Sequence, residues 1–146
     1  MEFKRFSAGY FEYGSNEPSS KEYAQGITNV NFNDPKFNQH ISNQNHENNQ
    51  NLKNFFEALG LCHTVVANVK QDKQGTDYTV YNASSPDELA LVNGARELGF
   101  FFIERDEDNN LVCETWDGVR KYKLLNVIEF DSTRKRMTVV VRTPKN

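Results

Sequence analysis

Four apolar runs, separated by clusters of turn-forming residues, fill the C-terminal part of the chain and limit what it can fold into. They cover residues 100–105, 111–116, 119–130 and 136–142. Short runs rich in Val, Ile, Phe and Tyr that are broken by Asp, Asn and Gly are typical of strands joined by tight turns. Asp117-Gly118 is the strongest turn signal, because a two-residue hairpin turn needs positive φ. The pattern predicts an antiparallel meander.

The segment just before these runs carries a full set of helix-boundary signals. Ser85 is a good N-cap, Pro86 suits the first helical position, and Gly99 stands where a left-handed C-terminal cap is wanted. Apolar residues recur at helical spacing between them, so a helix is predicted over residues 86–98. Glu88 has two interpretations: it closes a capping box with the Ser85 N–H, or it contacts a ligand. The spacing alone favours the capping box.

Residues 52–66 also repeat apolar side chains at helical spacing, which predicts a second core helix. His63 has no carboxylate or second histidine close to it in sequence, so a hydrogen-bonded structural histidine is favoured over a metal ligand or a base. A turn around Gly75 leads into a short predicted strand over residues 78–81. Helices packed against an antiparallel sheet make the expected fold class α+β.

The first 51 residues have a different composition. Residues 1–13 predict a weak strand that ends in a turn at Gly14, and Asn and Gln crowd the sequence from Asn29 onward. Such a stretch buries too little apolar surface to offset the entropy of ordering it, so we expect a mobile insertion with one short helix. The predicted organisation is a link and first strand over residues 1–14, an insertion over residues 15–51, and a core over residues 52–146.

Charge and cysteine content narrow the class of protein. The net charge of -3 over 146 residues, without a long basic run, speaks against a nucleic-acid surface, which needs Lys and Arg clustered over a whole face. Cys62 and Cys113 lie far apart without metal-ligand spacing and are expected to be free, buried thiols in a reducing compartment. No apolar run approaches the roughly 20 residues that span a bilayer, and no secretory signal is expected.

The chain contains, in order, the stretches MEFKRF, FFEALGLCHTVV, YNASSPDELALVNGARELGF and LLNVIEFDSTRKRMTVVVRTP. Together they resemble the nucleotide-binding domain of P-type ATPases, and within that family the phospholipid-transporting flippase class. The resemblance covers residues 1–14 and 52–144 and leaves the Asn-rich insertion unmatched. An isolated DE or RKRM would carry no information about the family, but SSPDELAL and EFDSTRKRM at this separation are specific for it.

The resemblance implies a nucleotide site made of five residues. The adenine-stacking aromatic matches Phe130, the acidic residue near the adenine amino group matches Glu88, and the nucleotide-facing lysine matches Lys135. Ser132 and Arg136 are weaker candidates. A stacked ring offers about 1–3 kcal/mol to a base, and a lysine offers a point charge to phosphate. Without the resemblance, Phe130 is equally well explained as a core aromatic and Lys135 as a solvated surface lysine.

The resemblance also implies a larger parent. The family's phosphorylated aspartate, Mg²⁺-binding carboxylates, membrane helices, Lys-Gly-Ala segment and later arginine have no match, so the core is expected to be incomplete at its C-terminus. The chain would then bind ATP or ADP without turnover, as a cytoplasmic domain of a membrane-embedded, Mg²⁺-dependent phospholipid translocase. It would position the γ-phosphate for an aspartate on the phosphorylation domain, in concert with the actuator domain. Two rivals stay open: the same domain in a P-type cation pump, and a non-catalytic protein-interaction module.

Overall fold

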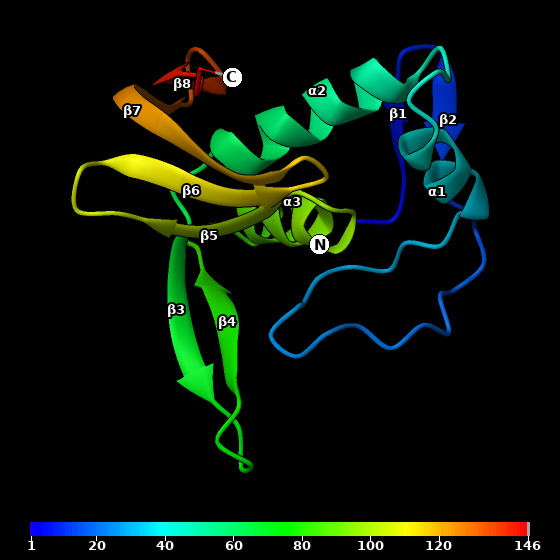
Figure 1. The fold of residues 1–146 in the computed structure, drawn as a ribbon, viewed down its shortest axis with the longest axis horizontal. Coiled ribbons are helices and arrows are strands. Elements are labelled where there is room, and N and C mark those ends of the chain that lie inside the picture. Colours follow the sequence, from blue (N-terminus) through cyan, green and yellow to red (C-terminus); the bar gives the residue numbers. More distant parts are fainter. Residues whose placement is uncertain (146) are drawn as a thin grey trace.

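The four apolar runs form one antiparallel sheet in the computed structural model, which describes residues 1–145 (Figure 1). Across the sheet its strands are β5 (Phe101–Arg105), β6 (Asn110–Thr115), β7 (Gly118–Asp131) and β8 (Arg136–Arg142). The predicted meander is therefore confirmed.

The β6–β7 turn differs from the prediction by one residue. Thr115 pairs with Gly118, so the turn residues are Trp116 and Asp117, and positive φ (97°) falls on Gly118 at the start of β7. A glycine in this conformation at the first residue of a strand is typical of a bulge that lets a tight turn enter the sheet.

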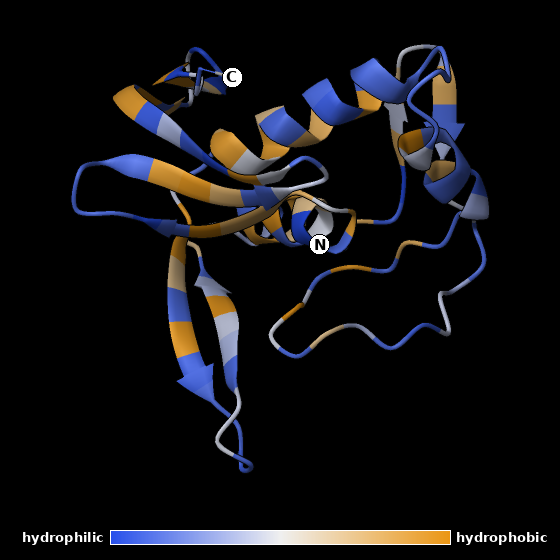
Figure 2. Cartoon of the chain, viewed as in Figure 1, coloured by the Kyte–Doolittle hydropathy of each residue, from blue (hydrophilic) through white to orange (hydrophobic). Residues whose placement is uncertain are grey.

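Two helices, α2 (Asn49–Leu61) and α3 (Pro86–Glu97), cover one face of this sheet. Every second residue of the strands faces them, so that Phe102, Cys113 and Tyr122 are buried while Glu114 and Lys121 are exposed. In Figure 2 the middle of β6 is apolar, whereas the β5–β6 turn and much of the visible surface of α2 are hydrophilic. The fold class is α+β, as expected. Within residues 1–145, no helix has the length and apolar composition that crossing a bilayer requires.

The N-terminal end of α3 was predicted correctly, but the end of α2 was not. Ser85 caps α3 by accepting a hydrogen bond from the Asp87 N–H at 3.2 Å. The second helix starts three residues before the predicted range and ends at Leu61, and Val66 already begins a strand. This strand, β3 (Val66–Gln71), pairs with β4 (Asp77–Asn82) in a hairpin that projects from the rest of the domain (Figure 1).

The N-terminal residues form a small hairpin rather than a single strand. The strands β1 (Phe6–Ala8) and β2 (Phe11–Tyr13) are joined at Gly9 and Tyr10, so the turn lies five residues before the predicted one at Gly14. The short helix expected in the insertion is α1 (Pro35–Ser42), which Asp34 caps by accepting from the Lys36 N–H at 2.9 Å.

The later part of the insertion has more anchors than its composition suggested. The side chains of Val30, Phe32 and Phe37 are buried in the main core. Asn48 is buried too, and its side-chain amide donates to the Ala8 carbonyl at 3.0 Å and to the Tyr13 hydroxyl at 2.8 Å. Satisfied hydrogen bonds remove most of the free-energy cost of burying an amide. Asn48 therefore connects the start of α2 to the β1–β2 hairpin instead of lying in solvent. The mobility of the segment stays a prediction.

Candidate functional site

The hairpin between β7 and β8 carries four of the five predicted site residues. Phe130 lies next to the end of β7 and its side chain is exposed, with 66% of the residue's surface accessible. Leu124 pairs with Val141 and Asn126 with Val140, so β7 holds one more residue than β8 at this point. Such a bulge shifts the alternation of the following side chains, so that Val127 packs against the core while Ile128 and Phe130 are exposed. The interpretation of Phe130 as a core aromatic is therefore wrong.

The turn after Phe130 is held by the side chain of Asp131. One carboxylate oxygen of Asp131 accepts from the Thr133 N–H at 2.6 Å and from the Arg134 N–H at 3.0 Å, which lowers the pKa of Asp131 because these bonds favour the ionised carboxylate. Lys135 closes the turn with a left-handed φ of 54°. Ser132, Lys135 and Arg136 are all exposed around this turn.

Glu88 lies at the start of α3 and is held by a residue that the sequence did not single out. Its Oε1 accepts from the Thr64 N–H at 2.5 Å, and the Thr64 hydroxyl lies 3.1 Å from each carboxylate oxygen. Among the described residues, no hydrogen bond joins this carboxylate to the Ser85 N–H, so the predicted capping box is wrong. A cross-element bond with Thr64 replaces it, and the helix end depends on the Ser85 hydroxyl alone for its side-chain cap.

Thr64 belongs to a short connection between α2 and β3, residues 62–65, which we call the 62–65 loop. His63 is 4% exposed in it; its Nε2–H donates to the Gly60 carbonyl at 2.8 Å, and its Nδ1 accepts from the Val65 N–H at 3.1 Å. The bond accepted from Val65 requires a neutral ring, and burial lowers the pKa of His63 to about 4 although the bond to Gly60 acts in the opposite direction. The expected structural histidine is confirmed. Its ring also explains why the helix stops at Leu61, since Val65 bonds the imidazole instead of continuing the helix.

The same loop reaches β8. The Cys62 thiol lies 3.7 Å from the Met137 carbonyl, one residue after Arg136. Cys62 is half-buried rather than buried as predicted, whereas Cys113 is fully buried; both are free, and burial raises the pKa of each thiol. The 62–65 loop thus joins the start of α3, which carries Glu88, to the strand that pairs with the Phe130 segment.

Glu88 makes no direct polar contact with the four predicted site residues of the β7–β8 hairpin within the described residues. Within residues 1–145, no hydrogen bond or ion pair links Glu88 to Phe130, Ser132, Lys135 or Arg136. A cleft of about 560 Å³ lies beside them, with Thr64, Phe102, Val127 and Glu129 in its walls. Thr64 binds Glu88, and Glu129 is the sequence neighbour of Phe130, so the cleft adjoins both halves of the predicted site.

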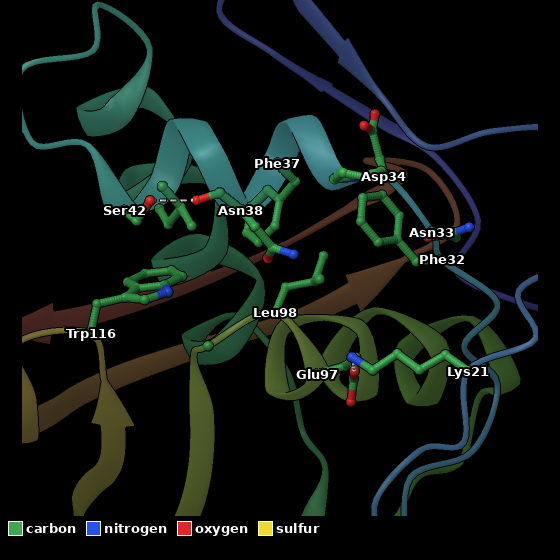
Figure 3. Close-up of a pocket in the computed structure, with 13 residues that line it drawn as sticks. Lys21, Phe32, Asn33, Asp34, Phe37, Asn38, Ser42, Glu97, Leu98 and Trp116 are labelled. Carbon is green, nitrogen blue, oxygen red and sulfur yellow. Dashed lines mark hydrogen bonds and ion pairs between the residues drawn. The ribbon is translucent and has the colours of Figure 1, made fainter.

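A second hollow, of about 550 Å³, lies between α1 and the C-terminal end of α3 (Figure 3). Phe32, Leu98 and Trp116 supply apolar walls, and an ion pair between Lys21 and Glu97 crosses its rim. None of the five predicted site residues lines it. In the part of the chain that the structure describes, no three His, Cys, Asp or Glu side chains gather closely enough to hold a metal ion.

The family follows from comparison with known proteins. Residues 51–146 match the family described as P-type ATPase, cytoplasmic domain N, and the chain belongs to this family. It is 48% identical over 92 residues to phospholipid-transporting ATPase dnf2 of Schizosaccharomyces pombe, which covers 63% of this chain and 6% of that protein. It is 39% identical over 94 residues to human phospholipid-transporting ATPase IK, covering 64% of this chain and 7% of that protein.

A plant relative extends the same pattern. The chain is 39% identical over 104 residues to probable phospholipid-transporting ATPase 7 of Arabidopsis thaliana, covering 69% of this chain and 8% of that protein. The chain therefore spans less than a tenth of the length of these relatives. The resemblance to an N domain of the phospholipid-transporting class is confirmed.

Proposed function

We propose that this domain binds the adenosine half of ATP for a membrane-embedded P-type ATPase that transports phospholipid. Adenine stacks on Phe130, its amino group faces Glu88, and the phosphates extend past Ser132 towards Lys135 and Arg136. The γ-phosphate then reaches an aspartate on the phosphorylation domain, with Mg²⁺ bound by residues outside this chain and the actuator domain completing the cycle. The printed names of the matched relatives support a phospholipid transporter over a cation pump.

The observation that carries the proposal is the exposed ring of Phe130. A phenylalanine on the core face of the sheet would be buried, yet the bulge presents this one to solvent at the end of β7. Covering such a ring releases about 1.5–3 kcal/mol, and stacking a base on it accounts for a similar amount. An exposed aromatic beside a basic turn therefore suits a nucleotide, which has an aromatic face and negative phosphates.

The same inventory of groups sets the strength of binding. One stacked ring, one carboxylate and one lysine, less the cost of association, leave roughly −4 to −5 kcal/mol, which corresponds to near-millimolar affinity. We expect ATP and ADP to bind alike and without Mg²⁺. Micromolar binding that requires Mg²⁺ would contradict this account.

A residue-resolved NMR titration with ATP tests the proposal. Phe130→Ala should abolish binding with little damage to the fold, whereas Tyr10→Ala is the control, because Tyr10 is an even more exposed aromatic on the distant β1–β2 turn. Lys135→Ala should weaken ATP and ADP more than adenosine, because the lysine acts on phosphate. If Phe130→Ala leaves the ATP affinity unchanged, the nucleotide site is elsewhere, and an interaction module becomes the better explanation of the exposed ring.

A further inference from the structure

We infer that Thr64 is a positioning residue for base recognition: it fixes the Glu88 carboxylate so that one of its oxygens is left for the amino group of adenine. The inference rests on the proposed function, because it concerns the same site. It adds a residue from the α2–β3 connection, and a reason for selecting one base, to that proposal.

The geometry separates the two oxygens of Glu88. Oε1 accepts from the Thr64 N–H at 2.5 Å and lies 3.1 Å from the Thr64 hydroxyl, whereas Oε2 has only the hydroxyl, also at 3.1 Å. A hydroxyl has a single proton to donate, so it cannot serve both oxygens fully. Each carboxylate oxygen accepts about two hydrogen bonds, and Oε2 therefore keeps free acceptor capacity.

The free oxygen has a chemical preference. An ionised carboxylate only accepts hydrogen bonds, and the 6-amino group of adenine is a donor. A purine without this group offers nothing to Oε2, and a purine with a carbonyl at the same position opposes one acceptor with another. A carboxylate held still by Thr64 therefore favours adenine, because less ordering entropy is lost when the base binds.

Thr64 is itself held on both sides. His63 binds the Gly60 carbonyl and the Val65 N–H through its two ring nitrogens, and Cys62 contacts the Met137 carbonyl of β8. The backbone N–H of Thr64 is thus fixed relative to both α2 and the sheet. Glu88 is half-buried at the start of α3, so its carboxylate has few other directions to take.

The test compares ATP with purine riboside triphosphate, which lacks the amino group, in NMR titrations of the full chain. One charge-assisted hydrogen bond corresponds to about a tenfold preference for ATP in the unaltered protein. Thr64→Val keeps the side-chain shape but removes the hydroxyl, and the preference should fall to about threefold or less, since only the backbone donor then orients the carboxylate. Thr64→Ser, which restores the hydroxyl, should restore the preference. A purely structural role would weaken both nucleotides alike and leave their ratio unchanged.

Glu88→Gln gives a second, independent readout. The two Thr64 donors need an acceptor, so they hold the glutamine oxygen in the place of Oε1 and direct its NH₂ group at the base. Two donors then face each other, and the preference for ATP should disappear. An unchanged ratio in Thr64→Val while Phe130→Ala still abolishes binding overturns this inference alone. Retention of the preference in Glu88→Gln overturns the inference together with the proposed contact between Glu88 and the adenine amino group, and leaves stacking on Phe130 standing. No binding of ATP by the unaltered chain overturns the proposed function and the inference together.

Discussion

Lowering the pH from 7 to 4 should weaken the fold chiefly through His63. The neutral ring accepts the Val65 N–H in a buried position, and protonation would replace this acceptor with a second donor. The pKa of His63 is lowered from 6.5 to about 4 in the folded chain. Between these values the unfolded state binds a proton and the folded state does not, so the stabilisation is complete above pH 6.5 and is lost as the pH falls towards 4.

The size of the effect follows from the two pKa values. A gap of roughly 2.5 pKa units at about 1.4 kcal/mol per unit corresponds to a loss of about 3 kcal/mol of unfolding free energy at pH 4. A domain of ordinary stability has about 5–15 kcal/mol in total, so the loss would be a large fraction of it.

Urea unfolding at several pH values between 7 and 4, followed by circular dichroism, measures this loss. His63→Asn, in which the side-chain oxygen can still accept from Val65 but does not titrate, should be less stable at pH 7 and show a flatter pH dependence. Carboxylates are common to both proteins, so the difference between the two curves isolates the imidazole. If His63→Asn loses as much stability as the unaltered chain between pH 7 and 4, the buried imidazole does not titrate as argued.

Three further outcomes can be checked. Gly60→Ala places a methyl group within 2.1 Å of a carbon of the Phe100 ring and should lower the unfolding free energy by about 1–3 kcal/mol in urea melts, although alanine is the better helix former. An unchanged midpoint would mean that the ring moves aside freely. A thiol reagent should label Cys62 before Cys113 in the folded chain, because burial raises the pKa of Cys113 to about 12; equal rates by mass spectrometry would contradict the packing. Residues 15–51 should exchange amide hydrogens faster than the rest of the chain, and uniform protection across residues 29–51 would contradict the prediction of a mobile segment.

The sheet and α3 could be predicted because their signals are local. A cap such as Ser85, a glycine with positive φ such as Gly118, and alternating apolar residues act within a few positions of themselves. The end of α2 could not, because the apolar spacing of a helix continues through Val66. In the structure the helix ends where the His63 ring forms hydrogen bonds with Gly60 and Val65. The spacing of apolar residues along the sequence does not reveal which hydrogen bonds a buried ring will form, so it could not predict this helix end.

The site was predicted in part for the same reason. Phe130 and Glu88 were predicted as site residues from sequence resemblance to a family. The exposure of Phe130, however, depends on a bulge that the apolar pattern does not reveal. The partner of Glu88 lies 24 residues away in sequence, and no spacing rule connects it to Thr64. The composition of residues 15–51 does not reveal that Asn48 is buried, because its hydrogen-bond partners Ala8 and Tyr13 precede this segment in the sequence.

The packing of Phe3 on α3 shows that the boundary of the family match differs from the boundary of the packed core. The family match begins at residue 51, yet the Phe3 ring lies directly on Gly94, where an added Cβ would come within 2.6 Å of it. Phe3 also contacts the Phe32 and Phe56 rings, so the first residues share one interior with the insertion and with α2. A truncation at residue 51 would keep every residue of the family match but uncover the side chains beneath this cluster. We therefore expect the smallest piece that folds independently to be larger than the segment that matches the family, and expression of residues 51–146 alone should yield an aggregating polypeptide.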